Sequence, residues 1–143
     1  MRVLFICTGN TCRSPMAQYL FNARCGEDDE ASSCGFAAMP GDDINPNSLA
    51  VLAEVGIDAS GHRARRFDLY MVDDFDALVV FTPAAKQALQ SVLSSKQAAK
   101  VRLLGDGIPD PYGQSIEVYR ACRDQIAAAV KEIVDDIDGT RNK

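Results

Sequence analysis

The sequence predicts an α/β fold in three layers, with a four-stranded parallel sheet covered by helices on both faces and a phosphate-binding loop after strand 1. Short apolar runs alternate with longer helical patterns, which favours parallel strands joined by helical crossovers. The first apolar run, residues 3–6, leads directly into the polar stretch 7–14 and then into a helical pattern. A chain of 143 residues suits a single domain spanning residues 1–143.

The individual elements follow from apolar spacing and from capping residues. Strands are expected at residues 2–6, 31–36, 76–81 and 101–104. Helices are expected at residues 15–25, 46–55, 67–74, 83–93 and 115–137. Ser14 is the predicted N-cap of the first helix, with Pro15 at the first helical position, and the acidic run 27–30 is predicted to be a solvated turn. The buried face of the last helix is marked by residues spaced three or four apart: Tyr119, Cys122, Ile126, Val130, Ile133 and Ile137.

Composition and charge exclude several classes of protein. The net charge of −5 argues against a protein that binds nucleic acid through charge. No apolar run approaches the length of a membrane span, and only four strongly apolar residues follow Arg2, too few for a signal peptide. Five cysteines, an odd number without a regular framework, suit a reducing cytosol. We therefore expect a cytoplasmic monomer without nucleic-acid or membrane partners.

The loop at residues 7–14 carries the strongest functional signal. Such a loop can turn successive backbone N–H groups inward, and the helix N-terminus adds positive partial charge, so that together they bind a phosphate-sized anion. A cysteine near a cation at a helix N-terminus is stabilised as the nucleophilic thiolate, which makes Cys7 the candidate nucleophile. The planar fork of Arg13 can grip two phosphoryl oxygens. The residues expected to surround the bound group are Thr8, Gly9, Asn10, Thr11, Cys12 and Ser14.

Other phosphate-binding and metal-binding patterns are absent from the sequence. The Walker A motif Gly-x4-Gly-Lys-Ser/Thr does not occur. Cys7 and Cys12 lack the spacing of zinc ligands, and the only histidine, His62, is far away in sequence. We therefore expect neither a metal nor a cofactor. Because the two thiols lie five positions apart in a loop that must curl, a disulfide between them remains an open alternative.

The stretch from Val3 to Pro15 resembles the signature of the low-molecular-weight protein tyrosine phosphatases, Val-Cys-x-Gly-Asn-x-Cys-Arg-Ser-Pro, with Ile6 as the one visible change. The resemblance extends over nearly the whole chain. Asp110-Pro111-Tyr112 is similar to a family loop in which the aspartate is the general acid and later activates water. The resemblance implies that Asp110 protonates the leaving group and that Tyr112 flanks the cleft and stacks on an aromatic substrate.

Two supporting residues are also implied by this resemblance. Ser33 lies in a Ser-Cys-Gly segment similar to the family's Ser-Ala-Gly, whose serine buttresses the loop asparagine; the alternative is a plain hydroxyl at a strand end. His62 lies in a segment similar to one that supports the anion loop. A general base is the competing interpretation of His62, and support from behind the loop is favoured.

These residues favour a phosphatase that hydrolyses phosphotyrosine in proteins through a phosphocysteine intermediate, with phosphate or other oxyanions binding in the loop as inhibitors. Thr11 raises phosphoarginine as an alternative substrate, because this chain resembles the protein arginine phosphatases in Thr-Gly-Asn-Thr-Cys-Arg-Ser-Pro. Arsenate reduction is less favoured, since residues 81–96 contain no redox cysteine. The intact Cys7, Arg13 and Asp110 argue against a catalytically silent module that only binds phosphorylated ligands.

Overall fold

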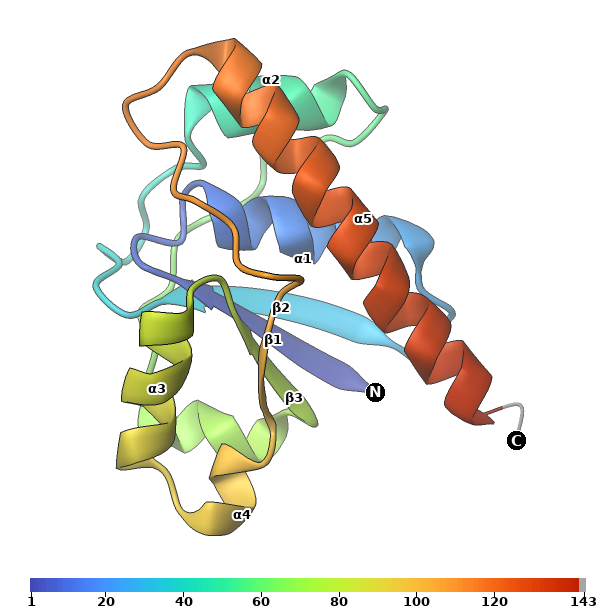
Figure 1. Ribbon diagram of the computed structural model, residues 1–143. Helices are drawn as coiled ribbons and strands as arrows, with labels where there is room; N and C mark the ends of the chain where they lie inside the picture. The colour runs from blue at the N-terminus through green and yellow to red at the C-terminus, as the bar shows by residue number, and fades with distance from the viewer. Residues whose placement is uncertain (142–143) are drawn as a thin grey trace.

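The computed structural model describes residues 1–141 and has the expected α/β architecture (Figure 1). One parallel sheet has the strand order β2-β1-β3-β4, with β1 at Arg2–Cys7, β2 at Glu30–Gly35, β3 at Ala77–Val80 and β4 at Val101–Leu103. The helices are α1 (Arg13–Arg24), α2 (Pro46–Ala53), α3 (Pro83–Val92), α4 (Ser95–Ala98) and α5 (Ile116–Arg141), with a 3-10 helix, η1, at Leu69–Asp74. The predicted four-stranded parallel sheet is confirmed.

The side chains of β1 alternate between two cores, one on each face of the sheet. Val3 and Phe5 belong to the larger core, which α1, α2 and α5 cover. Leu4 and Ile6 belong to the smaller core, which η1 and α3 cover. Figure 1 shows α5 running across α1, with α2 near the start of α5. The predicted apolar face of α5 is buried over its whole length, and no helix within residues 1–141 is long and apolar enough to cross a membrane.

The functional edge of the sheet lies at the carboxyl end of β1. β2 pairs with one side of β1 and β3 with the other, so the strand order reverses next to β1. Parallel α/β sheets bind ligands at such a point, beyond the carboxyl ends of their strands. The loop at residues 8–12 leaves β1 at this edge. The segment 104–115, which follows β4, reaches the same edge and contributes Ile108 and Asp110 to the surroundings of Arg13.

Two local predictions from the sequence were wrong. The first helix begins at Arg13 with Cys12 as its N-cap, and no side chain caps it. Ser14 is not the cap, because its hydroxyl lies 2.9 Å from the Cys7 sulfur and serves the loop instead. Pro15 still lies within the first turn, where backbone N–H groups have no partner inside the helix.

The acidic turn is the second correction. Asp29 is buried, and its carboxylate binds the Met1 amino group and the Arg141 guanidinium. Glu30 begins β2 and is therefore not part of the turn. The structure also contains α4, which the sequence analysis missed although Ser94 and Gln97 form a capping box at its start.

Replacing Gly35 with alanine is expected to lower the free energy of unfolding by about 1–3 kcal/mol, the usual cost of overpacking. A Cβ at this position would lie 2.6 Å from the Thr8 backbone oxygen and 2.9 Å from the Asn10 backbone nitrogen, and backbone atoms cannot move aside cheaply. Urea denaturation measures the loss. Gly61→Ala is the matched control, because no described atom lies within 4 Å of its added Cβ. Equal losses in the two variants would contradict the clash.

Candidate active site

The loop at residues 8–12 curls around a buried asparagine. Asn10 has a φ of 56° and is fully buried, a left-handed conformation that costs free energy in a residue with a Cβ. Five hydrogen bonds hold it in place. Its backbone N–H donates to Cys7 Sγ (3.3 Å), its Nδ2 donates to Ser14 Oγ (2.8 Å) and Ser33 Oγ (2.9 Å), its Oδ1 accepts from the Arg65 N–H (2.9 Å), and its carbonyl accepts from His62 Nε2 (2.8 Å).

His62 lies behind the loop, with Nε2 facing the Asn10 carbonyl. A carbonyl only accepts, so Nε2 must carry the proton. Burial is the largest influence on the ring and lowers the pKa of His62 below 6.5; the hydrogen bond to Asn10 opposes this, and the charges of Arg63 and Arg65 add to it. The ring is therefore neutral at about pH 7. This geometry favours support of the loop over a general base, because Nε2 is already engaged.

Cys7 ends β1 and lines a cavity of about 200 Å³. Two groups approach its sulfur: the Ser14 hydroxyl at 2.9 Å and the Asn10 backbone N–H at 3.3 Å. Hydrogen bonds donated to a sulfur stabilise its anionic form. The cavity is lined by Cys7, Thr8, Gly9, Thr11, Cys12, Arg13, Asp110 and Tyr112. Its size and the Arg13 cation in its lining suit a small anion presented on a larger substrate.

Arg13 is a buried cation in the wall of this cavity. One of its terminal nitrogens donates to the Ile108 carbonyl at 3.0 Å, and the guanidinium lies 5.6 Å from the centre of the Phe81 ring. Its Nε is the one buried side-chain nitrogen or oxygen within residues 1–141 that has no hydrogen-bond partner. A buried donor without a partner is costly, so this atom marks a position where an anion would be bound.

Asp110 lies at the rim of the cavity, with half of its side chain exposed. Its Oδ2 is 3.7 Å from a terminal nitrogen of Arg13, and its Oδ1 accepts from the Tyr112 backbone N–H at 3.0 Å. The turn that this bond closes leaves Tyr112 70% exposed beside the opening. A carboxyl group at this position can exchange a proton with a group that leaves the cavity toward solvent.

The other thiols near the loop remain neutral. Burial raises the pKa of Cys12, whose sulfur lies 3.4 Å from the Tyr119 hydroxyl of α5. Burial likewise raises the pKa of Cys34 and that of Cys122 to about 12. These thiols therefore bring no negative charge to the anion-binding loop. All five cysteines are free in the structure, so it holds no bond between Cys7 and Cys12.

Part of the predicted contact set must be corrected. Asn10 and Ser14 were expected among the groups that touch the bound anion, but both are fully buried and neither lines the cavity. They shape the loop from behind. The sequence analysis also missed two groups that hold Asn10 in this position. The backbone N–H of Arg65 binds Asn10 directly, whereas the side chain of Gln18, one helical turn beyond Ser14, accepts a hydrogen bond from Ser33, which in turn binds Asn10.

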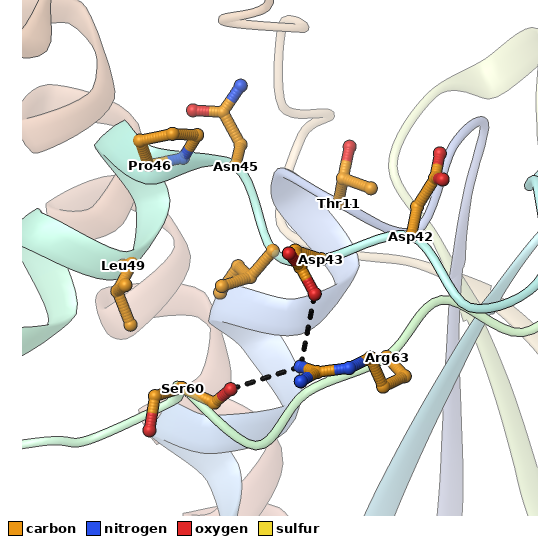
Figure 2. A pocket seen from close by; sticks show the side chains of 9 residues that line it. Thr11, Asp42, Asp43, Asn45, Pro46, Leu49, Ser60 and Arg63 are labelled. Atoms are coloured by element: carbon orange, nitrogen blue, oxygen red, sulfur yellow. Dashed lines mark hydrogen bonds and ion pairs between the residues drawn. The ribbon is translucent and has the colours of Figure 1, made fainter.

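A second, larger hollow of about 520 Å³ adjoins the cavity, and Thr11 lines both (Figure 2). Arg63 joins its two sides, because one guanidinium nitrogen lies 3.3 Å from Asp43 Oδ1 and donates to the Ser60 carbonyl at 3.1 Å. Backbone hydrogen bonds between residues 41–42 and Ala64 continue this contact. Residues 41–43, on one side of this hollow, are therefore bonded to the segment that carries His62. Within residues 1–141, no cluster of three or more His, Cys, Asp or Glu side chains is arranged to hold a metal.

Comparison with known proteins gives consistent matches along the chain. The family model described as low molecular weight phosphotyrosine protein phosphatase matches residues 2–143. The chain is 36% identical to a low molecular weight protein-tyrosine-phosphatase of Streptomyces coelicolor, covering 90% of this chain and 88% of that protein. The solved structure of the YwlE arginine phosphatase from Geobacillus stearothermophilus has a TM-score of 0.91 at 32% identity, covering 98% of this chain and 94% of that one. A YwlE mutant with a phosphorylated active-site serine also has a TM-score of 0.91, at 28% identity and with 99% of each chain covered.

Stability is expected to fall as the pH drops below about 6.5, because the pKa of His62 is lower in the folded chain than in the unfolded one. Below the unfolded pKa, the unfolded state therefore binds more protons than the folded state does. The contribution of His62 to the free energy of unfolding is complete above its pKa in the unfolded chain, and it is lost as the pH falls through its lower pKa in the folded chain. Denaturant titrations between about pH 5 and pH 8 measure the slope. His62→Gln keeps an N–H donor but does not titrate. Because His62 is the only histidine, the free energy of unfolding of this variant should no longer depend on pH in this range. An unchanged slope in the variant would assign the effect to another group.

Proposed function

This chain belongs to the low molecular weight phosphotyrosine protein phosphatase family, and we propose that it hydrolyses phosphotyrosine in proteins through a phosphocysteine intermediate. The observation that carries the proposal is the unpartnered Nε of the buried Arg13, in the wall of the cavity that Cys7 also lines. A phosphoryl group bound in this cavity could accept a hydrogen bond from the Arg13 Nε and at the same time contact the Cys7 sulfur. The proposed unit is a single domain of residues 1–143.

In the first proposed step, the Cys7 thiolate attacks phosphorus while the bond from phosphorus to the tyrosine oxygen breaks. Asp110 gives its proton to the departing oxygen, so that a neutral phenol leaves. Negative charge on the equatorial oxygens is stabilised by the backbone N–H groups of the loop and by the Arg13 guanidinium. The position of Asp110 at the rim, half exposed beside Arg13, supports this role.

In the second step, water attacks the phosphocysteine and the phosphorus–sulfur bond breaks. Asp110, now a carboxylate, accepts the proton of the water, and Cys7 returns as a thiolate while inorganic phosphate is released. The phosphorylated active-site serine in the related YwlE mutant supports a covalent phosphoenzyme in this family. The residues of the cavity suffice for both steps without a metal or cofactor.

Phosphoarginine is the second candidate substrate, and Thr11 is the observation that favours it. Its side chain lines both the cavity and the neighbouring hollow, so that a leaving group extending from the cavity into the hollow would pass it. A hydroxyl there can accept a hydrogen bond from a guanidinium, whereas an aliphatic side chain can only pack on a ring. One of the similar solved structures is an arginine phosphatase. The exposed Tyr112 ring, which can stack on a phenol, supports phosphotyrosine.

The proposed setting is a cytoplasmic monomer that meets phosphorylated proteins at the rim of the cavity. Its five free cysteines, all within the described residues, support a reducing compartment. Phosphate and other oxyanions are the proposed competitive inhibitors, since they would occupy the same donors as the substrate.

The test of the proposed function is hydrolysis of a phosphotyrosine peptide and a phosphoarginine peptide of matched sequence. We expect turnover of phosphotyrosine by the wild type and none above background by Cys7→Ser. A serine hydroxyl does not ionise at neutral pH and therefore cannot replace the nucleophilic thiolate. Inorganic phosphate release is the measurement, and near-ultraviolet circular dichroism checks that the variant is folded. Substantial turnover by Cys7→Ser would remove Cys7 from the mechanism.

Asp110→Asn is expected to slow aryl phosphates with poor leaving groups by about 10²–10⁴-fold and those with good leaving groups far less, since only the former need a proton. The measurement is kcat for a series of substituted phenyl phosphates. Asp106→Asn, in the same segment, is the matched control. Equal losses across the series would indicate that Asp110 has only a structural role.

Thr11→Ile is expected to change the ratio of kcat/KM for the phosphoarginine and phosphotyrosine peptides, lowering it because a hydrogen-bonding group is replaced by an aliphatic one. A loss of about tenfold in that ratio corresponds to one hydrogen bond. Thr8→Val is the matched control, because Thr8 lines only the smaller cavity. If the ratio does not move, Thr11 does not select the substrate.

A further inference from the structure

The hollow that adjoins the cavity has no part in the two proposed catalytic steps. It measures about 520 Å³, against about 200 Å³ for the cavity that Cys7 lines, and the two meet at Thr11 (Figure 2). A cavity of this size can take the phosphoryl group of a phosphorylated protein, but the residues on either side of the phosphorylated one must lie outside it. The hollow begins where such a chain leaves the cavity on the Thr11 side.

Part of the lining of this hollow is apolar and firmly held. It consists of Ile44, Pro46 and Leu49. Ile44 is buried, and Leu49 is half-buried and packs against the larger core. A surface of this kind can pack the methylene stem of a long side chain whose polar end stays in water.

The charged part of the lining carries an excess of negative charge. Asp42 and Asp43 contribute two carboxylates and Arg63 contributes one guanidinium, which leaves one carboxylate uncompensated. Arg63 is already engaged, because one of its nitrogens lies 3.3 Å from Asp43 Oδ1. The same nitrogen also donates to the carbonyls of Ser60 (3.1 Å) and His62 (2.7 Å). The uncompensated carboxylate is therefore that of Asp42.

Asp42 presents this carboxylate from a fixed backbone. Its N–H donates to the Met39 carbonyl at 3.1 Å, and its own carbonyl accepts from the Ala64 N–H at 2.8 Å. Figure 2 shows the exposed Asp42 side chain pointing away from Arg63, and neither a hydrogen bond nor an ion pair joins it to the other side chains drawn there. Because both backbone bonds are independent of the side chain, the carboxylate can be replaced without releasing the loop.

We propose that this hollow is a subsite for a basic side chain, lysine or arginine, near the phosphorylated residue of a protein substrate. The methylene stem packs on the apolar lining, and the cationic end pairs with Asp42. An acidic side chain at the same place is disfavoured, because it meets the uncompensated negative charge. The inference rests on the proposed function and deepens it, since it names the sequence context that the phosphatase selects.

The test uses phosphotyrosine peptides of otherwise neutral sequence, in which each position near the phosphotyrosine holds in turn lysine, norleucine or glutamate. Norleucine keeps the apolar stem of lysine without its charge. We expect kcat/KM, measured by release of inorganic phosphate, to favour lysine over norleucine by about two- to fivefold at one position, the range of an exposed ion pair, and to be lowest for glutamate. The preference should disappear in about 1 M NaCl, which screens charges beyond about 3 Å.

Substitutions at Asp42 decide whether its carboxylate is responsible. Asp42→Asn should lose the preference for lysine, and Asp42→Lys should reverse it in favour of glutamate. Asp74→Asn is the matched control, because it changes the net charge by the same amount from η1, outside the hollow. The peptides are compared within each variant, so a general change in activity cancels. Equal kcat/KM for all peptides with the wild type, a lysine preference that survives in Asp42→Asn, or one that is lost in Asp74→Asn overturns the inference.

A binding experiment separates this inference from the proposed function. The same peptides, carrying a fluorescent label, are titrated with Cys7→Ser, which is expected to bind them without turnover, and fluorescence anisotropy gives the dissociation constants. If the wild type hydrolyses none of the peptides but Cys7→Ser binds the lysine peptide about two- to fivefold more tightly than the norleucine peptide, the proposed function fails and the subsite stands. Hydrolysis of all peptides without preference refutes the subsite alone, and the absence of both hydrolysis and preferential binding refutes both.

Discussion

The active-site loop depends on one buried residue, Asn10, whose left-handed backbone is held by five hydrogen bonds. A non-glycine residue in this conformation costs on the order of 1–3 kcal/mol, and each buried hydrogen bond returns about 0.5–1.5 kcal/mol. The partners belong to β1, α1, β2 and the segment that carries His62. The loop is therefore shaped by the fold before an anion arrives.

The sheet makes this arrangement possible by bringing distant segments to one edge. Cys7 pairs with Gly35 in the register of β1 and β2, so Ser33 lies beside the start of the loop. Gly35 leaves room for the loop backbone, which passes within a distance that any Cβ would block. The parallel pairing of β1 with β3, and of β3 with β4, brings the segment after β4 to the same edge and puts Asp110 next to Arg13.

Much of this could be predicted from local sequence, and the remainder depended on tertiary contacts. Apolar spacing and capping residues predicted the strands and most helices, because those signals act within one turn or one strand. In the structure, Asn45 and Thr82 cap α2 and α3. Ser14 was assigned as a cap because its hydroxyl suits that position, yet the Cys7 sulfur and Asn10 compete for the same hydroxyl. The burial of Asp29 depends on Arg141, more than a hundred residues away, and no local pattern reports such a partner.

The residues in and around the cavity fall into two groups that differ in burial and in proposed role. The groups that shape the loop and the cation proposed to bind the anion are buried: Asn10 and Ser14 are fully inaccessible, and Arg13 is nearly so. The neutral thiols around them add no negative charge beside Arg13, which is consistent with the proposed local binding of a dianion by a chain whose net charge is −5. The groups proposed to meet the leaving group are exposed at the rim, where Tyr112 and Asp110 contact solvent. Because the rim residues carry little of the packing, substitutions among them can alter which leaving group fits the proposed site without disturbing the buried contacts that shape the loop.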